Sequence, residues 1–326
     1  MRTLLCIRSD YLSNPAGDTT LVMQTSKYLR ERGVETTVNY GQIQDFSVYD
    51  MVHLFNLTRI SETYEYFCRA KRQEKPVVIT PIYWDLSKFY RFSKNASAAR
   101  QWESYAPFRG KILNGCDAIY PSSNMERELI GREYGSSLPQ IVVYSGIELK
   151  DLSDSTPTGA RSENYILCAA RVCPRKNQLA LAKAAYQLGI GLILAGEADN
   201  PDYLNRCLAY QNVRYKGFLP FQRLRPLYTN ARMHVLCGFV ETPGLANLEA
   251  AACGCNILST AEGSAAEYFE DMALYCDPYK EGDILAKVEA GLTQNRQPHL
   301  KAHILKNFCL NSCMEPLYLS YCSIIR

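Results

Sequence analysis

The sequence has almost no excess of either charge, no long apolar run and no regular spacing of cysteines. Its 36 lysine and arginine residues against 33 aspartate and glutamate residues leave a net charge of +3, which excludes a polybasic protein that binds nucleic acid through its overall field. No run of about 18 apolar residues occurs, so we predict no membrane-spanning helix. The first residues contain no small-residue cleavage site, and we therefore expect a cytoplasmic protein. The 13 cysteines are scattered singly, which excludes a secreted disulfide scaffold and is typical of thiols in a reducing compartment.

Candidate metal ligands are also sparse. Cys253 and Cys255 flank a glycine but have no second cysteine pair and no histidine near them. His299 and His303 are four residues apart and could share a helix face, but no acid or cysteine accompanies them. We therefore predict no metal site. His234 lies in an apolar run and is expected in the core, whereas His53 is either satisfied locally at a strand end or contacts a ligand.

The length of 326 residues and a hydrophobic content of 47% are sufficient for two domains of roughly 150 residues each. Short runs of Val, Ile and Leu alternate with helical patterns, which indicates parallel sheets with crossover helices. Between residues 146 and 164, a polar stretch without regularly spaced apolar residues interrupts this alternation of strands and helices. We predict a first domain over 1–150, a linker over 151–163, a second domain over 164–300 and a helical segment over 301–326.

Both domains are expected to be doubly wound. The first should contain strands at 4–7, 51–55, 77–80, 118–120 and 141–144, with helices from about residue 18 and over 124–134. The second should contain strands at 165–169, 192–194, 213–215, 234–236, 256–259 and 273–275, with helices over 178–188 and 245–253. Because open parallel sheets bind ligands at the carboxyl ends of their strands, we expect a ligand cleft between the two domains.

The most informative motif of the second domain is a pair of glutamates separated by seven residues, Glu241 and Glu249. Glu241 follows a predicted strand, and Gly244 stands where a helix should begin with unpaired backbone N–H groups, which indicates an anion site. Glu249 lies four residues after Leu245 on one helix face, where its carboxylate can accept hydrogen bonds from a vicinal diol such as a ribose. The alternative is a glutamate that interacts with the helix dipole, together with an unrelated loop acid.

A second motif brings three cations, Arg171, Arg175 and Lys176, to the turn after the first strand of the second domain. An arginine and a lysine together suit a diphosphate, since one supplies a planar fork and the other a point charge. A solvated basic turn is the alternative. Arg171 lies at the carboxyl end of a predicted strand, where ligands bind in open parallel sheets, and this position favours a ligand site over a solvated turn.

The segment 86–102 holds four cations and no acid, interleaved with four aromatic residues. Such a segment can lie on an anionic membrane surface, where each basic side chain contributes about 1 kcal/mol. It can also be an acceptor-binding loop or an ordinary solvated helix.

These motifs together resemble glycosyltransferase family 4, whose members have two Rossmann-like domains facing a central cleft, the GT-B fold. The likeness covers most of the chain, and the C-terminal helix is expected to cross back to the first domain. The motifs in the second domain are Arg171 and Lys176, residues 215–219, the paired glutamates, 262–267 and 277–278, and those in the first are 17–20, 116–123 and 143–148.

The resemblance implies a retaining transfer of a sugar from a UDP- or GDP-linked donor in the second domain, without a metal or other cofactor. Arg171 and Lys176 would neutralise the diphosphate, and Glu241 would contact the donor sugar; these three are the expected catalytic residues. The remaining donor contacts implied by the resemblance are Gly17, Gly217, Phe218, Gly244, Leu245 and Glu249.

The first domain would hold the acceptor, a saccharide or a lipid-linked sugar, near Asp18, Tyr83, Trp84 and Asp85. Family members often carry a histidine after the strand at 77–80, and here that stretch contains none. The family's Gly-Arg-Leu is also Ala170-Arg171-Val172 in this chain.

Family habit implies a role in bacterial polysaccharide or glycolipid synthesis, with possible contact of 86–102 with the inner face of a membrane and no nucleic-acid partner. Two alternatives remain. One is a GT-B enzyme that isomerises or hydrolyses a nucleotide sugar, and the other is a protein that binds the nucleotide sugar without turnover.

Overall fold

The computed structural model describes residues 1–135, 138–148 and 164–325, which form two compact units. Unit 1 comprises Met1–Ser145 together with Asn311–Arg326, and unit 2 comprises Gly146–Leu310. Each unit is a parallel sheet with helices on both faces, so the predicted α/β class with two doubly wound domains is confirmed. The linker predicted over 151–163 lies outside the described residues.

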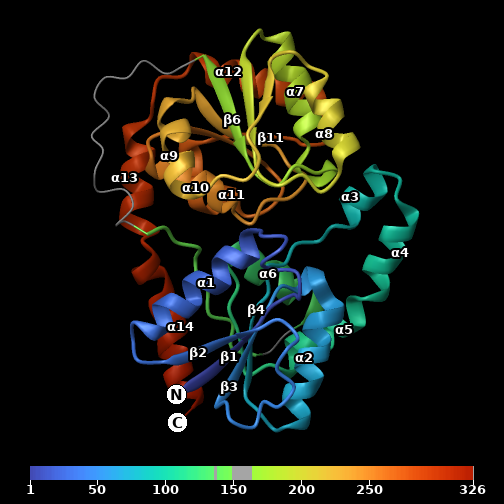
Figure 1. Ribbon diagram of the computed structural model, residues 1–326, viewed down its shortest axis with the longest axis vertical. Helices are drawn as coiled ribbons and strands as arrows, with labels where there is room; N and C mark the ends of the chain where they lie inside the picture. The colour runs from blue at the N-terminus through green and yellow to red at the C-terminus, as the bar shows by residue number, and fades with distance from the viewer. Residues whose placement is uncertain (136–137, 149–163, 326) are drawn as a thin grey trace. The chain divides into compact units, whose positions relative to one another are not determined.

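Unit 1 is built on a five-stranded sheet in the order β2-β1-β3-β4-β5 (Figure 1). Its strands are β1 (Arg2–Cys6), β2 (Glu35–Asn39), β3 (Met51–Phe55), β4 (Val77–Thr80) and β5 (Ala118–Ile119). All residues of β3 are buried, as expected for a central strand of a parallel sheet. The sequence analysis did not predict β2, because this edge strand consists of Glu-Thr-Thr-Val-Asn and has no apolar run.

The strand predicted at 141–144 is wrong. Backbone bonds join Ile119 N–H to Pro139 O, Ile141 N–H to Ile119 O and Val143 N–H to Pro121 O, but only an isolated bridge at Gln140 forms. Pro121 has no N–H to continue the parallel ladder. The ladder therefore stops after β5.

Unit 1 contains several helical segments. They are α1 (Gly17–Arg30), the short 3-10 helix η1 (Leu57–Arg59), α2 (Ile60–Arg72), α3 (Ser87–Phe92), α4 (Ala96–Ser104), α5 (Ala106–Gly115), α6 (Asn124–Tyr134) and α14 (Leu310–Ile324). Figure 1 shows α1 and α14 on one side of the sheet and α2 and α5 on the other.

The C-terminal helix α14 is held in unit 1 by hydrogen bonds from buried side chains. Tyr321 Oη lies 2.5 Å from His53 Nδ1, and Tyr120 Oη donates to Ser320 Oγ at 2.9 Å. His53 also contacts Thr80 Oγ1 through Nε2, and burial lowers its pKa to about 3. His53 is therefore a neutral core residue of unit 1.

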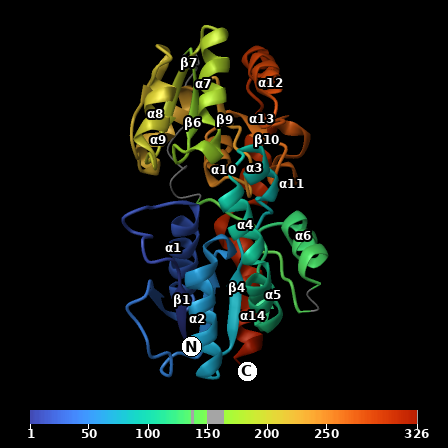
Figure 2. The same ribbon diagram turned by 90° about the vertical axis from the view of Figure 1, so that its right-hand side faces the viewer.

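Unit 2 contains a six-stranded parallel sheet in the order β11-β10-β9-β6-β7-β8. Its strands are β6 (Tyr165–Ala169), β7 (Gly191–Ala195), β8 (Val213–Tyr215), β9 (Met233–Leu236), β10 (Asn256–Thr260) and β11 (Leu274–Cys276). Its helical segments are η3 (Pro174–Lys176), α7 (Gln178–Gln187), α8 (Pro201–Leu208), α9 (Phe221–Asn230), α10 (Leu245–Ala252), α11 (Ala265–Phe269), η4 (Glu270–Met272), α12 (Glu281–Thr293) and α13 (Pro298–Asn307). Figure 2 shows the same elements from the side.

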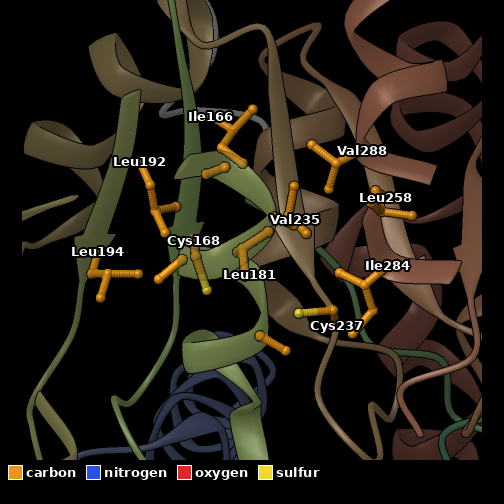
Figure 3. Close-up of a cluster of buried hydrophobic side chains, with 14 of the residues drawn as sticks. Ile166, Cys168, Leu181, Leu192, Leu194, Val235, Cys237, Leu258, Ile284 and Val288 are labelled. Carbon is orange, nitrogen blue, oxygen red and sulfur yellow. The ribbon is translucent and has the colours of Figure 1, made fainter. Parts of the chain in front are cut away.

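The main core of unit 2 lies between this sheet and the helices α7 and α12 (Figure 3). Ile166 from β6, Leu192 from β7 and Val235 from β9 belong to the same core cluster as Leu181 of α7 and Ile284 of α12. All five side chains are fully buried. Each such side chain contributes about 2 kcal/mol through burial of apolar surface. This rigid base positions the loops that follow the strands.

The segment predicted over 301–326 as one piece is divided between the two units. Helix α13 packs on α10 and remains in unit 2, whereas α14 from Asn311 onward belongs to unit 1.

All thirteen cysteines are free thiols, and ten of them are buried. Within the described ranges, no helix has the length and apolar character needed to cross a membrane.

Candidate active site

The candidate site of unit 2 centres on an ion pair between two residues that the sequence analysis singled out. Lys176 ends η3 after strand β6, and Glu241 follows strand β9. Lys176 Nζ lies 2.7 Å from both carboxylate oxygens of Glu241. The Glu241 side chain is only 3% exposed and that of Lys176 16%. An ion pair this deeply placed needs good geometry to offset the cost of desolvation.

Glu241 is joined by backbone hydrogen bonds to the loop that follows β10. Its N–H donates to Glu262 O at 3.1 Å, and its carbonyl oxygen accepts from Ser264 N–H at 3.0 Å. A Cβ atom at Gly263 would lie 1.9 Å from the Glu241 carbonyl oxygen, and one at Gly238 would lie 2.8 Å from its Oε1. Glycine is therefore required at position 263, whereas a side chain at position 238 would displace the Glu241 carboxylate.

Helix α10 begins directly beside this acid. Gly244 precedes the helix with φ +88°, and a Cβ there would meet Leu236 Cδ1 at 2.7 Å and Glu241 Oε2 at 3.4 Å. The N–H groups of Leu245 and Ala246 open the helix and have no intrahelical acceptor. An acid, a lysine and a helix N-terminus thus converge in one place.

A buried chain of hydrogen bonds ties the first turn of α10 to the sheet. Ala169 N–H at the end of β6 donates to His234 Nε2 at 3.0 Å, so the ring proton lies on Nδ1 and is donated to Asn247 Oδ1 at 2.8 Å. Asn247 Nδ2 in turn donates to Ser259 Oγ at 3.1 Å. Burial lowers the pKa of His234 to about 4, which keeps the ring neutral.

Arg171 is placed differently from Lys176. Its Nη1 lies 2.9 Å from Asp199 Oδ1 in the loop after β7, whereas Lys176 bonds Glu241. Arg175 contributes through its backbone, because its carbonyl oxygen accepts from Phe239 N–H at 2.9 Å. Of the three predicted cations, Lys176 is therefore paired directly with Glu241 of the glutamate motif.

Glu249 lies one turn along α10, partly buried. Its Oε2 accepts from Tyr228 Oη at 3.0 Å. Burial raises the pKa of the Glu249 carboxyl to about 7, and the tyrosine hydrogen bond opposes the rise. The carboxyl consequently titrates near neutral pH.

Gly217 and Phe218 follow strand β8. Gly217 has φ +64°, and its carbonyl oxygen accepts from Gly196 N–H at 2.8 Å. Tyr215 Oη donates to Gly196 O at 2.9 Å, which joins the same two loops a second time. Phe218 is 54% exposed, so its ring offers a face on which a base can stack.

In unit 1, Gly17 and Asp18 begin helix α1. Asp18 is buried and accepts from Arg8 Nε at 2.8 Å and from Asn56 Nδ2 at 3.0 Å. Burial alone would raise the pKa of the Asp18 carboxyl, but the bonds from Arg8 and Asn56 hold it below its usual value. Its oxygens thus accept hydrogen bonds from two side chains of unit 1.

Tyr83 and Asp85, two further predicted acceptor residues, are also engaged internally. Tyr83 is 1% exposed, and its hydroxyl bonds Glu133. Asp85 Oδ1 accepts from Ser87 N–H at 2.9 Å and from the Trp102 indole N–H at 3.0 Å. The neighbouring Trp84 is partly exposed.

The sequence analysis missed several residues that the site depends on. Asp199 bonds Arg171 and Tyr228 bonds Glu249, and Asp199 and Tyr228 both lie outside the predicted motifs. Asn247, between the two glutamates, and Gly263, in the motif at 262–267, lie within the predicted motifs but were given no role, and Gly238 adjoins the glutamate motif. Within the part of the chain that the structure describes, no three His, Cys, Asp or Glu residues are grouped so as to hold a metal ion.

Two parallel-sheet Rossmann-like units with these loops define a GT-B type fold, the architecture of one large class of glycosyltransferases. Residues 154–305, which lie in unit 2, match the sequence family described as glycosyl transferases group 1. No curated protein matches the chain.

The fold is similar to several solved structures. Sucrose-phosphate synthase from Thermosynechococcus elongatus has 15% sequence identity and a TM-score of 0.81, with 99% of each chain covered. HepE of Anabaena, in complex with UDP and glucose, has 15% identity and a TM-score of 0.77, covering 99% of this chain and 100% of the other. WaaG, a glycosyltransferase involved in lipopolysaccharide biosynthesis, has 15% identity and a TM-score of 0.66 over 98% of both chains. At these identities the similarity establishes the fold.

Proposed function

We propose that the protein is a retaining glycosyltransferase that moves a sugar from a nucleoside-diphosphate sugar to an acceptor hydroxyl. The observation that carries this proposal is the buried Lys176–Glu241 pair at the N-terminus of α10, within the region that matches the glycosyl transferase family. A cation and free helix N–H groups suit a diphosphate, and the adjacent acid suits the sugar attached to it.

Each group of the site then has a role in binding the donor. Lys176 and the first turn of α10 neutralise the diphosphate, with Arg171 assisting from the end of β6. Glu249 accepts hydrogen bonds from the ribose, and Phe218 and Gly217 bind the base. Because negative charge on the phosphate grows as the glycosidic bond breaks, these cations stabilise the transition state more than the ground state.

Lys176 can serve both the acid and the donor. An ammonium group has three donors, and two of them are directed to Glu241. The third remains for a phosphate oxygen. In the proposed donor complex the Glu241 carboxylate lies next to the carbon that reacts, and Lys176 neutralises this buried acid.

Transfer with retention needs no separate base in this arrangement. The acceptor oxygen forms its bond to the anomeric carbon on the face from which the phosphate oxygen departs, and the acceptor's proton passes to that phosphate oxygen. The reaction thus proceeds without the histidine that family members carry in the first domain and without a metal ion.

The donor that we favour is UDP-linked, because HepE, similar in fold, binds UDP and glucose. A GDP-linked donor is the alternative. The similarity to WaaG supports an acceptor in polysaccharide or glycolipid synthesis. A lipid-linked acceptor also suits the acid-free segment 86–102, which contains α3 and the first part of α4 and exposes Phe92.

Membrane contact is tested by sedimentation with vesicles of phosphatidylglycerol. Binding that is lost at high salt, and weakened when Lys88, Arg91 and Lys94 are replaced by glutamine, is the expected result, because surface charges are screened by salt. Equal sedimentation with neutral and anionic vesicles would contradict the contact.

The central experiment measures sugar transfer from UDP- and GDP-sugars to acceptor extracts, with calorimetry of nucleotide binding alongside. Lys176→Ala should abolish transfer and weaken UDP binding, and Glu241→Ala should abolish transfer while largely preserving UDP binding. Lys183→Ala is the matched control, because Lys183 forms an exposed ion pair with Glu281 in the same unit. Transfer unaffected by Lys176→Ala would overturn the proposal.

The same assay separates the two alternatives. Product formation from the donor without acceptor indicates an isomerase or a hydrolase. Nucleotide binding without any product indicates a binding protein. Retention itself is checked by NMR of the anomeric proton in the product.

A further inference from the structure

Three parts of the proposed donor site come from different elements of unit 2: the cations after β6, the first turn of α10, and the bond between Glu249 and Tyr228 of α9. One buried side chain, His234 of β9, contacts all three elements. We propose that His234 is a positioning residue that fixes these elements relative to one another and thereby sets the affinity for the donor diphosphate. The ligand's identity rests on the proposed function, whereas the contacts of His234 do not.

The first contact is with the strand that leads to the cations. His234 is paired with Leu167 in the register of β6 and β9, and its Nε2 accepts from the N–H of Ala169, two residues further along β6, at 3.0 Å. Arg171 follows Ala169 by two residues, in the turn that also leads to Lys176. The imidazole therefore bonds β6 at its carboxyl end, directly before the turn that carries the cations.

The second contact is with the first turn of α10. Because Nε2 accepts, the ring proton lies on Nδ1, and it is donated to Asn247 Oδ1 at 2.8 Å. Asn247 is the third residue of α10, and its own N–H donates to Gly244 O at 2.9 Å. Its Nδ2 donates to Ser259 Oγ of β10 at 3.1 Å. His234, Asn247 and Ser259 are all fully buried, so a shift of α10 against the sheet would leave polar groups without partners.

The third contact is a ring packing against α9. The rings of His234 and Tyr228 lie edge to face, with centroids 5.3 Å apart and an interplanar angle of 81°. Tyr228 is also fully buried, and its hydroxyl donates to Glu249 Oε2 at 3.0 Å. The imidazole thus limits where Tyr228 can lie, and Tyr228 in turn holds the carboxyl that we assign to the ribose.

These contacts distinguish His234 from a residue that only fills the core. All residues of β9 are buried, and an apolar side chain at 234 would fill the volume without the cost of desolvating an imidazole. The imidazole adds direction, because its two nitrogens bond β6 and α10 from one rigid ring. A displacement of about 1 Å in a group that binds the substrate can lower the rate about a hundredfold. A fixed distance between the cations and the N–H groups of α10 therefore favours binding of a diphosphate.

The test uses the full chain and separates the hydrogen bonds of His234 from its ring. His234→Phe keeps a ring against Tyr228 and removes both hydrogen bonds, whereas His234→Leu removes the ring as well. Asn247→Leu breaks the chain at its α10 end with a side chain of similar size. His53→Phe is the matched control, because His53 is an equally buried histidine of unit 1 whose ring nitrogens are also both hydrogen-bonded. Thermal unfolding verifies that each variant folds.

Calorimetry with uridine and UDP measures which part of the nucleotide each variant loses. His234→Phe should weaken UDP binding about tenfold or more and change uridine affinity less than about twofold, because the contact with Tyr228 is kept. His234→Leu should weaken both ligands. Asn247→Leu should resemble His234→Phe, and the double variant should lose no more affinity than either alone, since both break the same chain. His53→Phe should leave UDP affinity unchanged.

NMR provides a signature that requires no ligand. In the wild type at neutral pH, the nitrogen spectrum of His234 should show the proton on Nδ1. Hydrogen exchange at the Ala169 amide should be faster in Asn247→Leu than in the wild type, because the imidazole has then lost its bond to α10.

Four results would overturn the inference: a His234 ring protonated on Nε2, equal losses of UDP and uridine affinity in His234→Phe, fully additive losses in the double variant, or a similar loss of UDP affinity in His53→Phe. A wild type that shows the expected ring proton and amide exchange but binds no nucleotide would instead refute the proposed function, and His234 would remain the residue that joins β6 to α10.

Discussion

Affinity for the donor nucleotide should fall as the pH is lowered through 7, because Glu249 must be ionised to accept hydrogen bonds from a ribose. Burial on α10 raises the pKa of this carboxyl from 4.5 to about 7. The shift makes the folded carboxylate about 3 kcal/mol less stable than the carboxylate of the unfolded chain. Below pH 7 the protonated form predominates, and each further pH unit should weaken binding by about tenfold.

The variant Glu249→Gln isolates this effect from the titration of the nucleotide's own phosphate. Glutamine resembles the protonated carboxyl and does not titrate. The ratio of the dissociation constant of UDP for Glu249→Gln to that for the wild type should be large at pH 8 and close to one at pH 5.5, where the wild type has lost about thirtyfold in affinity. Calorimetry at both pH values measures the ratio, and an equal ratio at the two would refute the reasoning.

Stability should change with pH in the sense set by the same shift. A raised pKa means that the folded state binds more protons than the unfolded state between pH 4.5 and about 7, so this carboxyl's contribution to stability declines as pH rises through that window. Glu249→Gln should therefore be more stable than the wild type at pH 8 by up to about 3 kcal/mol and equal to it near pH 4. Tyr228→Phe removes the hydrogen bond that opposes the rise, so the midpoint should move above 7.

Three further substitutions, together with Lys183→Met as a control, probe the supports of the site. Lys176→Met leaves a buried glutamate unpaired and should cost about 3 kcal/mol in urea unfolding. Lys183→Met, in an exposed pair, should cost less than about 1 kcal/mol, and equal costs would contradict the assigned burial. Gly263→Ala, at φ +114° with a backbone oxygen 1.9 Å from the added Cβ, should lower stability by about 2 kcal/mol and abolish transfer; a fully active variant would contradict the close approach. His234→Phe breaks the chain that holds the first turn of α10, so UDP affinity should fall more than uridine affinity, and an equal fall in both would indicate a general loss of structure.

The fold was predictable wherever burial left a local pattern. Strands β3 and β6 are buried along their whole length and appear in the sequence as runs of apolar residues. Edge strand β2 has no such run, and the ladder at 141–144 fails because of Pro121, which lies in the partner strand's extension and not in the segment itself. Local pattern therefore identified the central strands and failed where pairing depended on a distant residue.

The candidate site was predictable in part. Lys176 and Glu241 were selected by residue type and by their place after strands, but their pairing at 2.7 Å depends on the packing of two loops that are 65 residues apart in the chain. Asp18 and Asp85 were predicted from the family resemblance. The structure shows that Arg8 and Trp102, respectively, occupy their oxygens.

The sequence by itself determined two series of alternating strands and helices and the types of side chain that follow the strands of each. Only the tertiary structure decided which of those side chains remain available to a ligand. The physical reason is that a buried polar group must find a partner, and the partner is chosen by proximity in the folded chain. Lys176 and Glu241 are paired at a helix N-terminus of unit 2, whereas Tyr83 bonds Glu133 and Asp85 bonds Trp102 within unit 1.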